Sequence, residues 1–169
     1  VLPIQLTASI VKTLSSLVVY LKYIAHDNDL IIIDEPEINL HPNIQIILAR
    51  ILVRLANNGF RLLVSTHSDY IIREFNNMVM LSNLIDKASV AQRLGYSKDE
   101  VLKSDNLGVY IFKYKNKRTK KVNMDSIAVS DTGFSVPSID EAIERQNKLA
   151  EELFYLLKYS TNDEEDPNL

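Results

Sequence analysis

The chain has 169 residues, 46% of them apolar, which is enough to bury a sizeable core in a single globular domain. Its formal net charge of -3 argues against a surface built as a whole to bind nucleic acid or anionic lipid, so any basic site has to be local. The absence of cysteine excludes disulfides, thiolate metal sites and cysteine nucleophiles. The sequence has neither an apolar stretch of membrane-spanning length nor a secretory signal, so we expect a cytoplasmic protein with no membrane partner.

The first part of the chain predicts a helix followed by a buried strand. Apolar residues recur at helical spacing over residues 10–24, which indicates one buried helix face, and Thr7 or Ser9 would cap this helix. Residues 30–33 form a continuous apolar run rich in isoleucine. Such a run is typical of a central parallel strand that is covered on both faces.

A second helix and a second strand follow. Residues 44–55 again carry apolar side chains at helical spacing, and the sequence Asn-Asn-Gly at 57–59 is expected to end this helix. Residues 60–66 predict another buried strand. Strand, helix and strand in this order form a βαβ unit with a right-handed connection, so we expect an α/β fold in which helices flank parallel strands.

The segment after the second strand predicts the end of the α/β core. Residues 68–75 predict a short helix capped by Ser68 or Asp69, and residues 78–81 predict a further short strand. The core is expected to stop after that strand and therefore to comprise residues 1–82.

Residues 83–160 predict a small α+β extension packed on this core. Its first stretch is polar and helical, broken at Gly95, with a capping box at residues 97–100. The extension ends in an amphipathic helix over residues 138–159. The acidic residues 161–169 are expected to be disordered.

A hairpin is predicted inside the extension. From residue 109 the pattern alternates, which places Tyr110, Phe112 and Tyr114 on one face. Basic residues crowd the same hairpin: Lys113, Lys115, Lys117, Arg118, Lys120 and Lys121. These residues would keep an exposed sheet edge soluble while the rings face the core. The alternative is a nucleic-acid site in which the rings stack on bases and the basic side chains contact phosphates.

The sequence LIIIDEPEINLHP at residues 30–42 places two carboxylates, Asp34 and Glu35, directly after the first strand. Open α/β sheets bind ligands at the carboxyl ends of their strands. At such an edge Asp34 would hold Mg²⁺, and Glu35 would polarise the water that attacks a terminal phosphate. His67 follows the next strand at the same edge, where a neutral imidazole could donate to a phosphate oxygen. The plain alternatives are two solvated acids at a strand end and a surface histidine.

This segment, the helix after it and the sequence RLLVSTHSDYII resemble the Walker B and switch-histidine region of ABC-type ATPases, in particular of bacterial AAA ATP-binding proteins related to the OLD and SMC proteins. The resemblance implies the C-terminal portion of a P-loop NTPase fold of the ABC type, with ATP and Mg²⁺ as cofactors. It also implies that Asp34 is the Walker B aspartate, that Glu35 is the catalytic glutamate and that His67 is the switch histidine that contacts the γ-phosphate.

Two further assignments come from the same resemblance. Glu37, Asn39 and His41 match the D-loop-like segment that lies along the dimer interface, although His41 could instead be a hydrogen-bonding residue before the helix that starts at Pro42. Ser9 stands in the place of the signature serine, which contacts the nucleotide held by the opposite subunit. The signature is degenerate because its usual glycine pair is absent, and the alternative is that Ser9 only caps its helix.

No Walker A loop, Gly-x-x-x-x-Gly-Lys-Ser/Thr, occurs in the sequence. In the family this loop lies N-terminal to the motifs found here. We therefore expect the chain to be the C-terminal part of a longer ATPase and to hydrolyse no appreciable ATP alone. The resemblance implies an ATP-driven homodimer that acts as a switch, in DNA maintenance or bacterial defence. The competing interpretations are a non-catalytic regulatory module that keeps the fold and a nucleic-acid-binding domain centred on the hairpin.

Overall fold

The computed structural model describes residues 4–115 and 121–160, without the side chains of residues 4–10, 12, 13 and 160. The chain divides into two compact units, one that ends at Phe134 and one that begins at Ser135. Nowhere in the described ranges does a helix combine the length and the apolar character needed to cross a membrane.

Helix α1 (Ile4–Tyr23) begins earlier than the apolar pattern indicates. Thr7 and Ser9 therefore lie within the helix, and the prediction that one of them caps it is wrong. The reason is local, because no Gly or Pro interrupts the sequence between Ile4 and Tyr23. The side chain of Ser9 lies outside the described residues, so its contact with a nucleotide stays a prediction.

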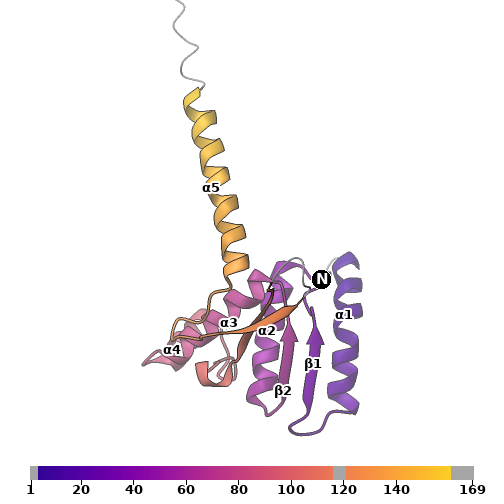
Figure 1. The fold of residues 1–169 in the computed structure, drawn as a ribbon. Helices are drawn as coiled ribbons and strands as arrows, with labels where there is room; N and C mark the ends of the chain where they lie inside the picture. The colour runs from indigo at the N-terminus through magenta and orange to yellow at the C-terminus, as the bar shows by residue number, and fades with distance from the viewer. Residues whose placement is uncertain (1–3, 116–120, 161–169) are drawn as a thin grey trace, which may run out of the picture. The chain divides into compact units, whose positions relative to one another are not determined.

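Strands β1 (Leu30–Asp34) and β2 (Arg61–Ser65) pair in parallel and are joined by helix α2 (Pro42–Asn57), as predicted (Figure 1). The register places Asp34 opposite Ser65, so both strands end at the same edge of the sheet. The α/β class and the strand–helix–strand unit are thereby confirmed.

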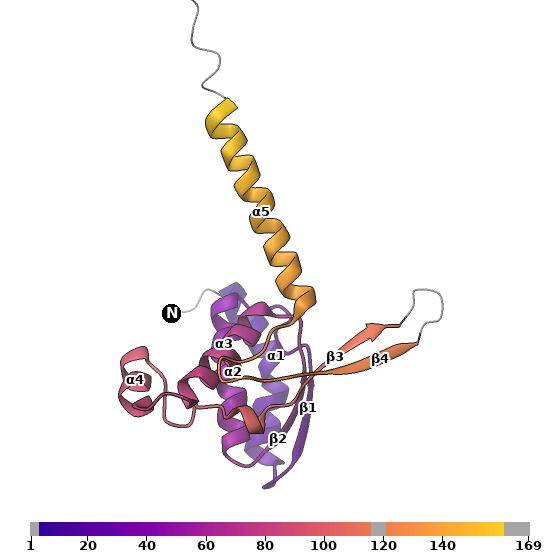
Figure 2. The same ribbon diagram turned by 60° about the vertical axis from the view of Figure 1, so that its left-hand side comes forward.

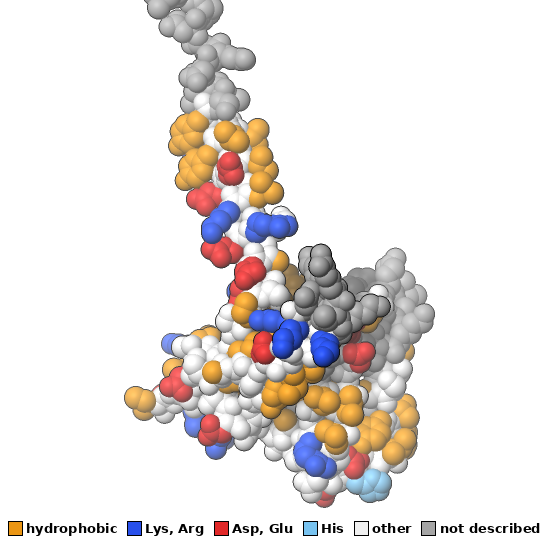
Figure 3. Space-filling view, viewed as in Figure 1, with side chains coloured by type: hydrophobic (Ala, Val, Ile, Leu, Met, Phe, Trp, Pro, Cys, Tyr) orange, Lys and Arg blue, Asp and Glu red, His pale blue; other side chains and the backbone are white. Residues whose placement is uncertain are grey.

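Helices α1, α2 and α3 (Asp69–Ser82) cover only one face of this sheet (Figures 1 and 2). The main buried cluster beneath that face is apolar: Leu40, Leu48, Ala49, Leu52, Val53, Ile71, Met78, Val79 and Leu102. On the opposite face Ile32 and Leu63, which are register partners, are 66% and 56% exposed. The prediction that the strands are covered on both faces is wrong for the described residues, because all three helices lie on one side. Apolar side chains therefore face outward there (Figure 3).

Helix α3 includes residues 78–81, so the short strand predicted at this place is wrong. Val79 favours a strand by local propensity, but Met78 and Val79 continue the buried helix face that begins with Ile71. Packing of one long amphipathic face decides the structure. The predicted start of the helix is confirmed, because the Ser68 hydroxyl accepts the N–H of Ile71 at 3.2 Å.

Helix α4 (Lys87–Leu94) ends at Gly95, whose φ of 77° lies in the left-handed region, where the sequence predicts a break. The Glu100 carboxylate accepts the N–H of Ser97 at 2.9 Å, which is the bond expected of a capping box. The residues directly after Glu100 do not form an α-helix, and the next regular element is the short 3-10 helix Ser104–Asn106. The extension is therefore less helical than predicted.

Strands β3 (Val109–Tyr114) and β4 (Val122–Ile127) form the predicted antiparallel hairpin. The aromatic rings of this hairpin do not face the core. The expectation that they do so while the basic residues keep the sheet edge soluble is therefore wrong. Phe112 is 70% exposed, and the two neighbouring tyrosines on its face are exposed as well: Tyr110 and Tyr114. Three of the basic residues lie outside the described residues: Lys117, Arg118 and Lys120.

Helix α5 (Pro137–Ser160) forms the second unit and confirms the predicted C-terminal helix. Exposed apolar side chains gather in its C-terminal part (Figure 3), among them Leu149, Leu153 and Leu156. The acidic residues 161–169 lie outside the described residues. The boundary between the two units lies after Phe134 and does not coincide with the boundary predicted after residue 82. Compactness does not define a functional core, so the predicted regions 1–82 and 83–160 stay predictions.

Candidate functional site

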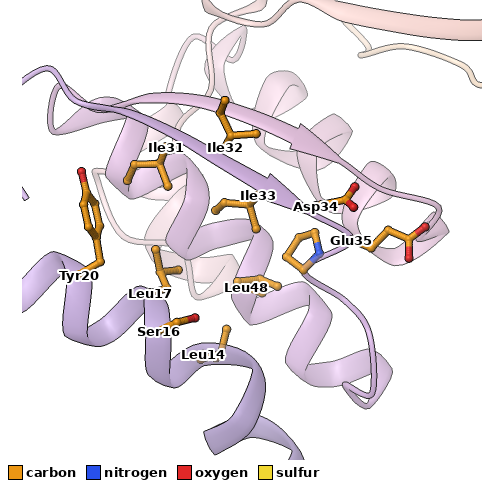
Figure 4. A pocket seen from close by; sticks show the side chains of 11 residues that line it. Leu14, Ser16, Leu17, Tyr20, Ile31, Ile32, Ile33, Asp34, Glu35 and Leu48 are labelled. Carbon is orange, nitrogen blue, oxygen red and sulfur yellow. The ribbon is translucent and has the colours of Figure 1, made fainter.

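Polar residues meet where β1 and β2 end. Asp34 is the last residue of β1 and Ser65 the last residue of β2, and Ser65 Oγ donates a hydrogen bond to Asp34 Oδ1. Both residues are exposed, and Figure 4 shows Asp34 and Glu35 at the end of the strand. An oxygen-rich pair is therefore accessible at the edge where open α/β sheets bind ligands.

Glu35 has an unusual backbone conformation, with a φ of 43° in the left-handed region. A residue with a Cβ atom is disfavoured there by about 1 kcal/mol or more. The conformation is held by Ser65, because the N–H of Glu35 donates to Ser65 O at 3.1 Å and to Ser65 Oγ at 3.2 Å. Strain of this kind collects at functional sites.

His67 lies two residues beyond β2, and its Nε2 is 3.4 Å from Glu35 Oε1. The two side chains are 86% and 39% exposed, so an ion pair between them would add little to stability. A ligand can instead reach both groups from solvent. The structure therefore brings Asp34, Glu35 and His67, all predicted from the sequence, to one edge of the sheet.

The Glu37 carboxylate links the loop after β1 to the loop after β2. Glu37 Oε1 accepts hydrogen bonds from Thr66 Oγ1 and from the N–H of His67, both at 2.7 Å. Glu37 Oε2 is buried and has no hydrogen-bond partner within the described part of the chain. Glu37 thus holds the segment that carries the histidine.

A second set of hydrogen bonds joins the same two loops through Gln45 of α2. Gln45 Nε2 donates to Leu40 O at 2.8 Å, and Gln45 Oε1 accepts from the Ser68 hydroxyl. The N–H of Ser68 in turn donates to Thr66 Oγ1 at 3.1 Å. The loop after β2 is therefore held from α2 as well as from Glu37.

His41 caps the N-terminus of α2. Its Nδ1 accepts the N–H of Asn43 at 3.4 Å, and Pro42 follows as the first residue of the helix. This geometry favours the hydrogen-bonding alternative for His41. Asn39 adopts a positive φ of 60° in the loop before it. The interface role expected for Glu37, Asn39 and His41 stays a prediction.

A groove of about 340 Å³ lies between α1 and β1 and extends to Asp34 and Glu35 (Figure 4). Helix α1 lines it with Leu14, Ser16, Leu17 and Tyr20. The Tyr20 hydroxyl donates to Asp29 Oδ2, and this bond raises the pKa of Tyr20 and lowers that of Asp29. It also ties α1 to the residue before β1, so that the helical wall of the groove is fixed.

Residues 4–72 match a family model described as AAA ATPase domain. The match runs from α1 into the first turn of α3, so it includes every predicted site residue. No curated protein and no solved structure gives a significant match. We call residues 4–72 the AAA-type segment. Its similarity to ATPase domains suggests nucleotide binding and ATPase-type activity in general terms.

The AAA-type segment offers partial ligands for a magnesium ion. Among the described residues no group of three or more His, Asp and Glu side chains could enclose a metal ion. Mg²⁺ that is bound with a nucleotide needs only one or two protein carboxylates, because phosphates and water complete its coordination. The exposed carboxylate of Asp34, next to the Ser65 hydroxyl, fits this shared mode of binding.

Several residues of the site are missed by sequence reasoning. Aligning the two strands at their last apolar residues would have placed Ser65 beside Asp34, so this contact has a signal in the sequence. The contacts of Thr66 and Gln45 have none, because they depend on how two loops fold against each other.

Proposed function

We propose that the chain carries the Walker B half of the nucleotide site of an ABC-type ATPase. The observation that supports this proposal most is the strained backbone of Glu35 at the end of β1. It places the Glu35 carboxylate beside the exposed Asp34 and 3.4 Å from His67 Nε2. Asp34 holds Mg²⁺, Glu35 polarises the attacking water and His67 donates a hydrogen bond to the γ-phosphate. A bound Mg²⁺ supplies positive charge that offsets the negative charge on the phosphates.

The site is composite in this proposal. An N-terminal part of the protein supplies the Walker A loop that binds the phosphates, and it also covers the open face of the sheet. Two observations support this arrangement. The sheet has only two strands within the described part of the chain, so further strands could pair with it. Ile32 and Leu63 also offer an apolar surface for further packing. The chain alone accordingly does not hydrolyse ATP at an appreciable rate.

The proposal includes a homodimer that ATP closes and hydrolysis opens. Ser9 contacts the nucleotide held by the opposite subunit, while Glu37, Asn39 and His41 lie along the interface. A role in DNA maintenance or bacterial defence rests on the resemblance alone, and the expected cytoplasmic location is likewise a proposal. A non-catalytic regulatory module is the alternative, and it has no use for a carboxylate carried on the strained backbone of Glu35.

The test is Glu35→Gln in the full-length protein. The amide keeps the shape of the side chain but polarises water poorly, so phosphate release should fall by about 100-fold or more. MgATP binding, measured by calorimetry, should persist, and ATP-trapped dimers should appear in size-exclusion chromatography. Glu152→Gln on the exposed surface of α5 is the matched control and should change neither measurement. Equal phosphate release from the Glu35→Gln and wild-type proteins would exclude Glu35 as the catalytic base.

A second candidate function is the binding of single-stranded nucleic acid by the hairpin. The observation that favours it is the exposure of the rings on β3, since exposed rings can stack on bases. The described part of the same hairpin also carries lysines, of which Lys113 lies on the other face of β3: Lys113, Lys115 and Lys121. These residues could contact phosphates.

Titration with single-stranded and duplex oligonucleotides at two salt concentrations tests this function. Phe112→Ala should weaken single-strand binding by about tenfold, because stacking on one ring contributes about 1 to 3 kcal/mol. Phe154→Ala, which removes an exposed ring from α5, is the control and should leave the affinity unchanged. Absence of binding by the wild-type protein at low salt would rule the function out.

A further inference from the structure

The Glu37 side chain starts from a well-fixed loop. The N–H of Leu40 donates to Glu37 O at 2.9 Å, and the N–H of Ile38 donates to Glu35 O at 3.1 Å. Pro36 and Leu40, on either side, are buried. Backbone bonds and core packing therefore determine the place from which the Glu37 carboxylate reaches toward β2.

Both hydrogen bonds that the Glu37 carboxylate accepts come from the segment that carries His67. One of them is made by the main-chain N–H of His67, and a bond from an amide to a carboxylate is roughly twice as strong as one between neutral groups. The other is made by the preceding residue, Thr66. The imidazole itself is 86% exposed. Its place near Glu35 is therefore determined by where the main chain of His67 is held.

The second carboxylate oxygen of Glu37 is unfavourable for folding. Oε2 is buried without a hydrogen-bond partner among the residues described, and burying such an atom costs about 1 to 3 kcal/mol. An apolar side chain of similar size would avoid this cost, but it would leave the Thr66 hydroxyl and the His67 N–H without their acceptor. The oxygen that holds Thr66 and His67 therefore explains a glutamate at this position, and the buried second oxygen does not.

We propose that Glu37 is a positioning residue, which fixes the main chain of His67 so that the imidazole faces Glu35 and the phosphate beside it. This inference rests on the proposed function. It gives Glu37 a role within its own subunit, in addition to the interface position that the resemblance implies. A displacement of about 1 Å at a catalytic group can slow a reaction about 100-fold, so the effect belongs in kcat and not in KM.

The first part of the test observes the main chain of His67 directly. NMR spectra of full-length protein labelled in histidine are compared for the wild type, Glu37→Ala and Glu37→Gln, with the His67 amide assigned from its loss in His67→Asn. In Glu37→Ala this amide loses its acceptor, so its exchange with solvent should accelerate about tenfold or more. Glu37→Gln keeps Oε1 as acceptor and should preserve the slow exchange. The His26 amide is the control, because it also donates to a carboxylate, that of Asp29, at 2.9 Å.

The second part measures ATP hydrolysis at steady state. In Glu37→Ala kcat should fall about 10- to 100-fold while KM for MgATP changes less than about threefold, and Glu37→Gln should restore kcat to within about threefold. An unchanged His67 amide in Glu37→Ala overturns the positioning role, whatever the activity. A raised KM or a lost dimer with unchanged kcat also overturns it, in favour of a role at the interface alone. If the wild-type protein hydrolyses no ATP, the proposed function fails, and the exchange of the His67 amide still decides whether Glu37 positions this residue.

Discussion

Gly133 lies in a turn that closes on Asn76. Its φ is 98°, and a Cβ atom at this position would lie 2.2 Å from Asn76 Oδ1. The Asn76 side chain cannot move aside without breaking two hydrogen bonds to Phe134, at 2.8 and 3.0 Å. Gly133→Ala should therefore lower the free energy of unfolding by about 2 to 4 kcal/mol, as measured by urea denaturation.

Gly95→Ala is the matched control for this substitution. Gly95 also has a positive φ, 77°, but no atom lies within 4 Å of the place where a Cβ would stand. Only backbone strain of about 1 kcal/mol is expected there. Equal losses of unfolding free energy in the two variants would contradict this expectation, because they would mean that the Asn76 side chain moves aside without destabilising the fold.

Residues of the candidate site differ in how far the sequence predicts them. Asp34 ends an apolar strand, Glu35 follows it and His67 lies two residues after the next strand. The parallel pairing of β1 with β2 brings such positions together. The left-handed backbone of Glu35 could not be predicted, because glutamate has no preference for it and Ser65 imposes it through tertiary contacts. The link from Glu37 to Thr66 is unpredictable for the same reason.

Helices α2 and α3 are joined by a buried ion pair. Arg50 Nε lies 2.6 Å from Glu74 Oε1, and the Glu74 side chain is 5% exposed. The same guanidinium donates to Gly95 O at 3.1 Å and stacks on Tyr96, so the pair also holds the end of α4. Glu74→Ala leaves the guanidinium of Arg50, which is 25% exposed, without its charged partner. The free energy of unfolding should fall by about 2 to 4 kcal/mol in denaturant titrations, somewhat less than for a fully buried pair.

An exposed ion pair provides the comparison for the Glu74→Ala prediction. Arg54 Nε is 2.8 Å from Asp99 Oδ2, but the two side chains are 51% and 38% exposed. Asp99→Ala should cost about 1 kcal/mol or less, since water screens such a pair. A loss as large as that of Glu74→Ala would show that burial does not decide the energy of these pairs.

The helices and strands of the βαβ unit are predictable because their apolar spacing is a local property of the sequence. Residues 78–81 are the instructive error, since a short run such as Met-Val-Met-Leu fits a strand and a buried helix equally well. Its place on the continued face of α3 decides the question. The rings of β3 are a second error, because alternation predicts that they share a face and says nothing about what covers that face.

The whole chain extends well beyond its AAA-type segment. That segment ends within α3, whereas the first compact unit continues to Phe134 and α5 forms the second unit. The uncovered face of the sheet, with Ile32 and Leu63 in pairing register, could not be predicted either. A continuous apolar run indicates that a strand is meant to be buried, but not which part of a protein buries it.

This uncovered face has a consequence for protein synthesis. An exposed apolar face can pack against other copies of the chain and lead to aggregation. β1 and β2 are therefore at risk for as long as they are folded and uncovered. In the proposed arrangement the covering part is N-terminal, so the ribosome completes it first, and N-terminal units generally fold first during translation. The order of synthesis would then protect the sheet from the moment it forms.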